Sequence, residues 1–600
     1  MFTHAIRTFV LLAATCAAGL AQQDPAALFQ THCASCHSAG STAGAPLPAT
    51  LRQMPAKQIL EALMTGKMRE VASSAGTADR EAIAKYLGLP DGGQAIPASA
   101  RCAAPMAWKS SASAWNGWGL DGANTRFQSA KSAGLAASAV PKLKLKWAFG
   151  FPGATTAFAQ PTVEGGSLFV GSADGTVYAL DAQTGCVHWT FSAGEGVRTA
   201  ILISEDGKAA YFGDLHGFVY SVNAASGELI WKNHVDEHPF AAITGTPKLA
   251  GGRLYVPVSG GDEAVSASNP KFECCTFRGS IVALDAATGK QIWKTYTIAE
   301  AARQTGQNAG GTKVFGPSGV SLWSSPTIDM EKKVIYAGTG VNYTNPATAG
   351  SDAIVAFDME TGRILWSRQI TTSDVYNFGC QTPELMNCAK EPGKDADFGH
   401  SPVLRSLGGG KRVLVAGQKS GVVTAIDPDH EGRILWQKRI AAGGGQGGIL
   451  WGGASDDKGL VYFGVSDWDP GKPEAGGGMY ALQLATGKVV WSTAAPKPGC
   501  MGTPGCSAAA PAPVTAIPGA VLQGAMDGHL RAYESRGGRI VWDFDTAKEF
   551  ATVNGVKARG GSINAAGPVI AGGMVYSNSG YARVPSMPGN VLLAFSTDVK

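Results

Sequence analysis

The sequence predicts a mainly β fold: an eight-bladed β-propeller with a small all-α domain at its N-terminus. Two observations predict the propeller. A turn motif followed by a tryptophan recurs along most of the chain, and 80 of the 600 residues are glycine, which suits many short strands joined by tight turns. A third observation, a C-x-x-C-H motif near the N-terminus, predicts the small extra domain.

The repeat unit is clearest between Ile281 and Trp293. Ile281 to Leu284 has the composition of a strand, Asp285 to Gly289 that of a tight turn, and Gln291 begins the returning strand. An aspartate side chain can accept bonds from backbone N–H groups just after it, and glycine tolerates the positive φ that closes such a turn. Seven copies of the unit end at Trp189, Trp231, Trp293, Trp366, Trp436, Trp491 and Trp542.

An eighth unit is split between distant parts of the chain. Leu592 to Phe595 supplies its strand half, and Lys144 to Trp147 supplies its tryptophan half. We therefore expect the two ends of the array to join and close the ring. The repeat tryptophans are expected to be structural, each packing between neighbouring blades.

The first 21 residues are typical of a secretory signal, with Arg7 followed by the apolar run Phe9 to Leu20. That run is too short to span a bilayer, and no other segment is long and apolar enough, so we expect no transmembrane segment. The expected location is periplasmic or secreted. The net charge of +4 is spread along the chain, which gives no indication of a nucleic-acid partner.

The motif Cys33-Ala34-Ser35-Cys36-His37 is the attachment site of a covalent c-type haem. Cys33 and Cys36 would bond the haem, and His37 would be the first iron ligand. The alternative, a thioredoxin-like redox disulfide, is disfavoured by the histidine and by the lack of a βαβ pattern.

A methionine is expected as the second iron ligand. Met54, Met64 and Met68 are candidates, and Met68 is preferred because it follows Gly66-Lys67. We predict a cytochrome c domain over residues 22–92, a Pro-, Gly- and Ala-rich linker over 93–114, and the propeller over 115–600.

The remaining cysteines of an exported protein are expected to form disulfides, although the sequence leaves their connectivity open. Three pairs are close neighbours in the chain, and two cysteines are left over. The expected pairs are Cys274 with Cys275, Cys380 with Cys388, Cys500 with Cys506, and Cys102 with Cys186.

The repeat array, preceded by Trp115-Asn116-Gly117 and Asn124-Thr125-Arg126-Phe127, resembles the pyrroloquinoline quinone (PQQ) dependent alcohol dehydrogenases over residues 115–600. With a cytochrome before the propeller and Cys274 to Ser280 in an insertion, it is most similar to the polyvinyl-alcohol dehydrogenase branch. The resemblance implies a quinohaemoprotein that oxidises alcohols, secondary alcohols and polyvinyl alcohol among them. Hydride would pass to PQQ, and electrons would leave through the haem to a soluble cytochrome or another respiratory acceptor.

The resemblance also implies a site for the quinone and a calcium ion. Arg198 resembles the residue that binds the quinone carboxylates, Trp323 the floor beneath the quinone, and Lys419 the cation at the quinone oxygens. The other implied quinone-binding residues are Thr244, Trp451, Asn564 and a capping Cys274–Cys275 pair, and the implied calcium ligands are Asp262 or Glu263 together with Asn342.

Three departures from the family pattern affect this expectation. The usual base position falls on Asn377, so Asp374 is expected to be the general base, or the mechanism differs. An acidic quinone partner is replaced around Phe158 to Pro161, and Cys274–Cys275 lies one blade later than the family's vicinal cysteines.

Two other functions are weighed beside this one. The propeller could be a quinone-free binding scaffold fused to a cytochrome c, since a fold does not fix a function. A PQQ-dependent sugar dehydrogenase is the alternative within the same class.

Overall fold

The computed structural model describes residues 24–37, 48–51, 56–64, 68–69, 71–88, 96–108, 113–382 and 386–598. The chain forms two compact units, residues 1–91 and 92–600. The predicted signal segment and the candidate ligand Met54 lie outside the described residues. The domain boundaries expected at 22, 93 and 115 stay predictions.

The first unit is helical, as expected for the small domain. Its α1 helix begins directly after Asp24, whose side chain accepts the N–H of Ala26 at 3.0 Å and so caps the helix. Leu28, Ile59 and Ile83 bring α1, α3 and α4 into one apolar cluster. Its helices are α1 (Pro25–His32), α2 (Pro48–Leu51), α3 (Ala56–Met64), the 3-10 turn η1 (Val71–Ser74) and α4 (Thr77–Leu87).

The second unit is the predicted eight-bladed propeller: eight antiparallel sheets follow one another along its described residues. The first blade contains β2 (Thr162–Glu164), β3 (Ser167–Gly171), β4 (Thr176–Asp181) and β5 (Val187–Ser192), and the second β6 (Leu202–Ile203), β7 (Ala209–Gly213), β8 (Phe218–Asn223) and β9 (Leu229–His234). The third contains β10 (Ala241–Ala242), β11 (Lys248–Ala250), β12 (Arg253–Gly260), β13 (Ser280–Asp285) and β14 (Gln291–Tyr296), and the fourth β18 (Thr327–Asp329), β19 (Val334–Gly338), β21 (Ala353–Asp358) and β22 (Ile364–Gln369).

The remaining blades complete the ring. The fifth contains β23 (Val403–Gly408), β24 (Lys411–Gly417), β25 (Val422–Asp427) and β26 (Arg433–Arg439), and the sixth β27 (Ala454–Ser455), β28 (Leu460–Gly464), β29 (Met479–Gln483) and β30 (Val489–Thr493). The seventh contains β31 (Thr515–Ile517), β32 (Ala520–Gly524), β33 (His529–Glu534) and β34 (Ile540–Asp545), and the eighth β37 (Val569–Ala571), β38 (Met574–Ser579), β39 (Val591–Ser596) and β1 (Lys144–Gly150).

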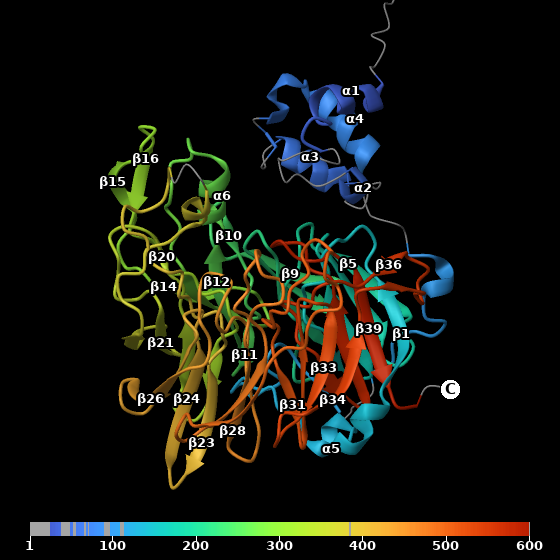
Figure 1. Cartoon of the computed structure of the whole chain (residues 1–600), viewed down its shortest axis with the longest axis vertical. Helices are drawn as coiled ribbons and strands as arrows, with labels where there is room; N and C mark the ends of the chain where they lie inside the picture. The colour runs from blue at the N-terminus through green and yellow to red at the C-terminus, as the bar shows by residue number, and fades with distance from the viewer. Residues whose placement is uncertain are drawn as a thin grey trace, which may run out of the picture. The chain divides into compact units, whose positions relative to one another are not determined.

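The ring closes where β1 and β39 lie side by side in the eighth blade, as the split repeat predicts (Figure 1). They pair antiparallel from Lys144 with Ser596 to Gly150 with Val591. The two ends of the array therefore share one sheet, and no blade edge is left open at the junction.

The repeated turn locks each blade to its neighbour. Asp285 accepts the N–H and the hydroxyl of Thr288 at 2.8 and 2.7 Å, and Gly289 has φ +71°. Trp231 of the preceding blade donates its indole N–H to the carbonyl of Ala286 at 3.0 Å. A Cβ on Gly289 would lie 2.5 Å from that indole, so glycine both closes the turn and admits the tryptophan. The repeat tryptophans thus pack between blades as predicted.

Residues 115–128, which we call the hub segment, bond the first strands of all eight blades in chain order. The segment therefore contacts one strand of each blade in turn and links all eight blades. Its contacts are Trp115 with Val163, Asn116 with Ile203, Asp121 with Lys248, Gly122 with Ile328, Ala123 with Leu404, Thr125 with Ser455, Arg126 with Ala516, and Gln128 with Ile570.

All four predicted disulfides are formed: Cys102–Cys186, Cys274–Cys275, Cys380–Cys388 and Cys500–Cys506. Part of the segment expected to be a linker is held on the propeller, because Cys102 is bonded to the first blade and Trp108 lies against Gly165 and Gly207. In the part of the chain that the structure describes, no helix is both long and apolar enough to cross a membrane.

Several insertions lie within or directly after the strands of the third and fourth blades. α6 packs against the 3-10 turn η4, which contains Cys380. The insertion elements are α6 (Asp262–Ser268), the hairpin of β15 (Arg303–Gln307) and β16 (Lys313–Gly316), the pair β17 (Ser318–Gly319) and β20 (Asn342–Thr344), and η4 (Phe378–Gln381). The other short elements are η2 (Ala98–Ala100), α5 (Ala130–Ala133), η3 (Ala137–Lys142), and the pair β35 (Glu549–Phe550) and β36 (Ala558–Arg559).

Candidate active site

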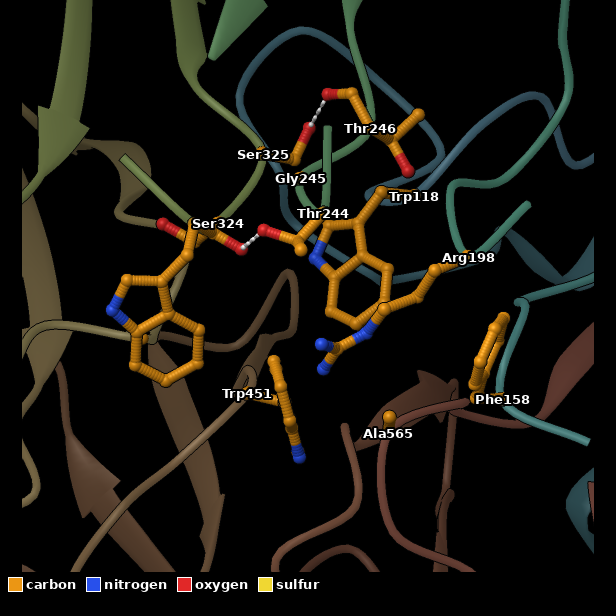
Figure 2. A pocket seen from close by; sticks show the side chains of 12 residues that line it. Trp118, Phe158, Arg198, Thr244, Gly245, Thr246, Ser324, Ser325, Trp451 and Ala565 are labelled. Atoms are coloured by element: carbon orange, nitrogen blue, oxygen red, sulfur yellow. Dashed lines mark hydrogen bonds between the residues drawn. The ribbon is translucent and has the colours of Figure 1, made fainter. Parts of the chain in front are cut away.

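A pocket lies among the loops that lead into the first strands of several blades (Figure 2). The hub segment contributes Trp118 to its wall. Four of the predicted quinone-binding residues meet here, although they are far apart in the sequence. The lining residues are Trp118, Phe158, Arg198, Thr244, Gly245, Thr246, Trp323, Ser324, Ser325, Gly399, Trp451 and Ala565.

Arg198 points its guanidinium into the pocket, 4.3 Å from the centre of the Trp451 ring. Its Nη2 is buried and has no hydrogen-bond partner, and no carboxylate of the described residues lies within 4.0 Å. Burial lowers the pKa of Arg198 by removing water from the cation. An unpaired buried cation beside an aromatic face suits a planar, anionic ligand.

Two indoles form the aromatic surface of the pocket. Trp323 and Trp451 meet edge to face with ring centres 5.0 Å apart. Gly399 lies against Trp323 so closely that an added Cβ would be 1.9 Å from the indole. Asn564 accepts the indole N–H of Trp451 at 2.7 Å, so it supports the lining residue and does not itself line the pocket. Thr244 donates to the carbonyl of Trp323 at 3.3 Å.

Lys419 joins this pocket to a cluster of buried carboxylates. Its Nζ lies 5.3 Å from the Trp323 ring and donates to Asp395 at 2.8 Å and to Asp397 at 2.9 Å. Burial opposes the charge on Lys419, but the two carboxylates outweigh it and raise the pKa of the lysine. The lysine is therefore a fixed cation between two acids.

Sequence reasoning missed Asp395 and Asp397. The available signal was two acids one residue apart in Asp395-Ala396-Asp397. Asp395 has φ +57° and lies outside any strand, so a strand period does not predict where the two side chains project. Asp397 also accepts the N–H of Val341 at 2.5 Å, which occupies its second oxygen. The second oxygen of Asp395 is buried and has no partner, and a Cβ on Gly445 would lie 2.7 Å from it. Glycine at that position keeps the space beside this oxygen open.

The structure distinguishes the two candidate calcium ligands at the start of α6. Asp262 accepts the backbone N–H groups of Thr276 and Phe277 at 3.0 and 3.1 Å, so it anchors the segment after the vicinal disulfide. Glu263 belongs to the acidic cluster. Burial raises the pKa of the Glu263 carboxyl well above its usual range, and Asp397 and Asp395 raise it further.

Asp352 is a further buried acid that sequence reasoning missed. Neither of its oxygens has a hydrogen-bond partner. Burial raises its pKa well above the usual range, and Asp397, Asp374 and Asp395 add to the effect. Glu263, Asp352, Asp395 and Asp397 thus share one cation, Lys419. Buried carboxylates in such excess are stabilised by a bound hard cation.

Asp374, the predicted base, has both oxygens engaged by backbone. They accept the N–H groups of Asp395 and Ala396 at 3.3 and 2.8 Å. Asp374 therefore holds the turn that carries Asp395.

Two asparagines near the cluster also hold loops together. Asn342, a predicted calcium ligand, accepts the N–H of Thr348 at 2.7 Å with its side-chain oxygen. The side chain of Asn377 donates to the carbonyls of Tyr343 and Asn387, both at 2.9 Å. The side-chain oxygen of Asn377 accepts the N–H of Gly379 at 2.8 Å, so neither asparagine oxygen is free. The carboxylates are therefore the better ligands for a cation.

The vicinal disulfide Cys274–Cys275 lies in an apolar cluster with Val258, Phe277 and Tyr343. It is buried and does not line the pocket.

In the helical unit, the five haem-motif residues follow α1. The N–H of His37 donates to the carbonyl of Cys33 at 3.0 Å, and both thiols are free. Cys33 and Met68 pack against the same apolar cluster. Free thiols and a buried histidine in one turn fit covalent haem attachment.

Comparison with known proteins places the chain in a family. Residues 115–397 match the model of the glucose, ethanol and alcohol dehydrogenase β-propeller domain, and 21–87 match the cytochrome c oxidase, cbb3-type, subunit III model. Residues 419–559 match the model of the outer membrane protein assembly factor BamB. A polyvinylalcohol dehydrogenase of a Pseudomonas species is 39% identical over 99% of this chain and 97% of that protein. The chain belongs to the PQQ-dependent quinohaemoprotein alcohol dehydrogenases.

Two further matches accord with that membership. A polyvinylalcohol dehydrogenase of Sphingopyxis sp. (strain 113P3) is 38% identical over 96% of this chain and 93% of the relative. The crystal structure of the Comamonas testosteroni quinohemoprotein alcohol dehydrogenase shares the fold, with a TM-score of 0.60, 19% identity and 84% of each chain covered.

The residues present fit the two organic cofactors of a quinohaemoprotein alcohol dehydrogenase. The unpartnered Nη2 of Arg198 suits a carboxylate of the quinone, and the Trp323–Trp451 surface suits its rings. Cys33, Cys36 and His37 suit the haem.

Proposed function

We propose that this chain is an exported dehydrogenase that oxidises an alcohol in the Trp323–Trp451 pocket, with PQQ and a calcium ion bound there and a c-type haem in the helical unit. The observation that carries the proposal is Arg198, whose buried Nη2 has no partner, in a pocket whose Trp323 ring lies 5.3 Å from Lys419 of the Lys419–Asp395–Asp397 triad. When bound, the quinone supplies a two-electron acceptor and the haem a one-electron carrier.

Each group of the chain has a distinct task in this proposal. Arg198 binds the quinone carboxylates, and Lys419 holds one oxygen of Asp395. The free oxygen of Asp395 takes the proton of the alcohol hydroxyl as general base. Asp374, the candidate expected from the sequence, remains the alternative base, but its contacts favour a positioning role.

We infer that the calcium ion is held by Glu263 and Asp352, whose pKa values burial raises well above the usual range. The support is chemical: these are hard oxygen donors, and Asp352 has two buried oxygens without partners. Asp262 is a further candidate ligand, because backbone N–H groups occupy only one of its oxygens and the other is buried without a partner. Asn342 is a poorer ligand because its side-chain oxygen accepts the N–H of Thr348. His37 and Met68 are the proposed iron ligands of the haem.

Export to the periplasm or the cell exterior is supported by the signal-like start of the sequence and by four disulfides, which persist in oxidising compartments. The proposed acceptor of the electrons is a soluble cytochrome or another respiratory carrier.

The proposed substrates are secondary alcohols, including polyvinyl alcohol, because two relatives that match nearly the whole chain are polyvinylalcohol dehydrogenases. The test compares turnover of polyvinyl alcohol, short secondary alcohols and aldoses by the protein loaded with PQQ and calcium. We expect turnover of the alcohols and none of the aldoses. Turnover of aldoses alone would favour a sugar dehydrogenase, and failure to bind PQQ would favour a scaffold.

A further inference from the structure

A second arginine, Arg583, lies beside Phe158, which lines the same pocket as Arg198. It lies between β38 and β39, and its guanidinium carbon is 5.4 Å from the centre of the Phe158 ring. Phe158 and Arg198 both line the pocket. Arg583 itself is exposed, whereas the Nη2 of Arg198 is buried.

The backbone that carries Arg583 is fixed to the segment that carries Phe158. The N–H of Ala582 donates to the Thr156 hydroxyl at 2.9 Å, and the N–H of Gly589 donates to the carbonyl of Thr155 at 3.0 Å. The turn also closes on itself, since the N–H of Tyr581 donates to the carbonyl of Met587 at 3.1 Å. These hydrogen bonds therefore hold the backbone of Arg583 beside the segment of Phe158.

Charge at this end of the pocket is uncompensated. No carboxylate of the described residues lies within 4.0 Å of Arg583 or of Arg198. The two cations influence each other, because Arg583 adds to the effect of burial in lowering the pKa of Arg198. Phe158 stands in the stretch where the family resemblance expects an acidic quinone partner. Two neighbouring cations without an acid suit a ligand that carries more than one carboxylate.

We propose that Arg583 is a second carboxylate-binding residue for the quinone, which has three carboxyl groups: Arg198 holds the inner end and Arg583 the outer. This proposal rests on the proposed function, because it requires PQQ to bind in this pocket. No covalent step is involved. Arg583 adds affinity and draws the anionic quinone toward the pocket mouth.

The test measures PQQ binding by the full-length, haem-containing, quinone-free protein in calcium buffer, using equilibrium dialysis. The variants are R583Q, R583K and, as a matched control, R363Q, which removes an exposed arginine from the turn between β21 and β22. We expect R583Q to raise the Kd for PQQ about fivefold to tenfold, R583K to restore most of the affinity, and R363Q to leave it unchanged. Added salt should reduce the difference in Kd for PQQ between the wild-type protein and R583Q, because salt screens the attraction between the arginine and the carboxylate.

The trimethyl ester of PQQ separates charge recognition from pocket shape. Binding of this neutral ester should be the same for wild type and R583Q, with the same apparent Tm for both proteins. Equal PQQ affinity of wild type and R583Q, or an equal loss of ester binding, would overturn the role of Arg583 and leave the proposed function standing. Failure of the wild-type protein to bind PQQ would overturn both.

Discussion

The hydrogen bonds of single side chains determine which groups at this site are available for chemistry. Lys419 occupies one oxygen of Asp395 and one of Asp397, and Val341 occupies the other oxygen of Asp397. Only Asp395 keeps an oxygen without a partner in this triad. The proposed roles of Asp395 as base and of Asp374 as its support rest on this pattern of hydrogen bonds.

Replacing Asp395 by Asn should lower kcat by about 100-fold or more, because the amide cannot take a proton from the alcohol. The expected change in apparent Tm is small, since the Lys419 contact can persist to the amide oxygen. The variant D374N should instead lower the apparent Tm, because it weakens the bonds that hold the turn of Asp395. Steady-state kinetics and thermal unfolding of both variants distinguish the two assignments. Full activity in D395N together with loss in D374N would return the base to Asp374.

His400 is a buried histidine that the catalytic proposal does not use. Its Nε2 accepts the N–H of Gly453 at 2.6 Å, and burial lowers its pKa to about 3. The unfolded chain takes up this proton near the ordinary pKa of about 6.5, so folding requires the neutral ring. The contribution of His400 to stability is complete above that pH and is lost as the pH falls toward 3.

The variant H400Q, whose amide oxygen can accept the same N–H, should flatten this acid dependence. The wild-type protein should lose up to about 1.4 kcal/mol per pH unit from this group below pH 6.5. Denaturant unfolding from pH 7 to pH 4.5 measures both slopes. Identical slopes for wild type and H400Q would show that other groups control the acid limb.

At the scale of elements, local patterns predicted the blades well. The turn chemistry of Asp285 to Gly289 and the tryptophan that follows are encoded within about ten residues, so the sequence alone located them. The site was only partly predictable. Asp352, Asp395 and Asp397 lie in irregular loops between strands, and their meeting at Lys419 depends on how those loops cross the ring. A repeat pattern in the sequence does not show how loops that are far apart in the chain come together.

The hub segment is the element on which the ring depends. Arg126 is 1% exposed and donates to the carbonyl of Val514 at 2.7 Å, to Gln160 at 2.7 Å and to Thr515 at 2.9 Å. Replacing it by Met should lower stability by about 3 kcal/mol, because three buried acceptors lose their donor. The exposed-site variant R363M should have no such effect. Guanidinium unfolding of the two variants measures the difference, and equal midpoints would show that Arg126 does not hold the ring.

At the scale of the whole molecule, the proposed function requires both units of the chain. The propeller unit carries the pocket proposed for the quinone and the alcohol, and the helical unit carries the haem motif. Closure of the ring by β1 and β39 fixes the pocket residues, which come from loops of different blades. We propose that electrons from the alcohol reach the haem of the same chain.

The most direct test is the absorption spectrum of the haem in the full-length protein during anaerobic addition of a secondary alcohol. We expect reduction of the haem only when PQQ, calcium and alcohol are all present. Omission of any one of the three should leave the haem oxidised. A haem spectrum that does not respond to the complete mixture, in protein shown to bind PQQ, would contradict the claim.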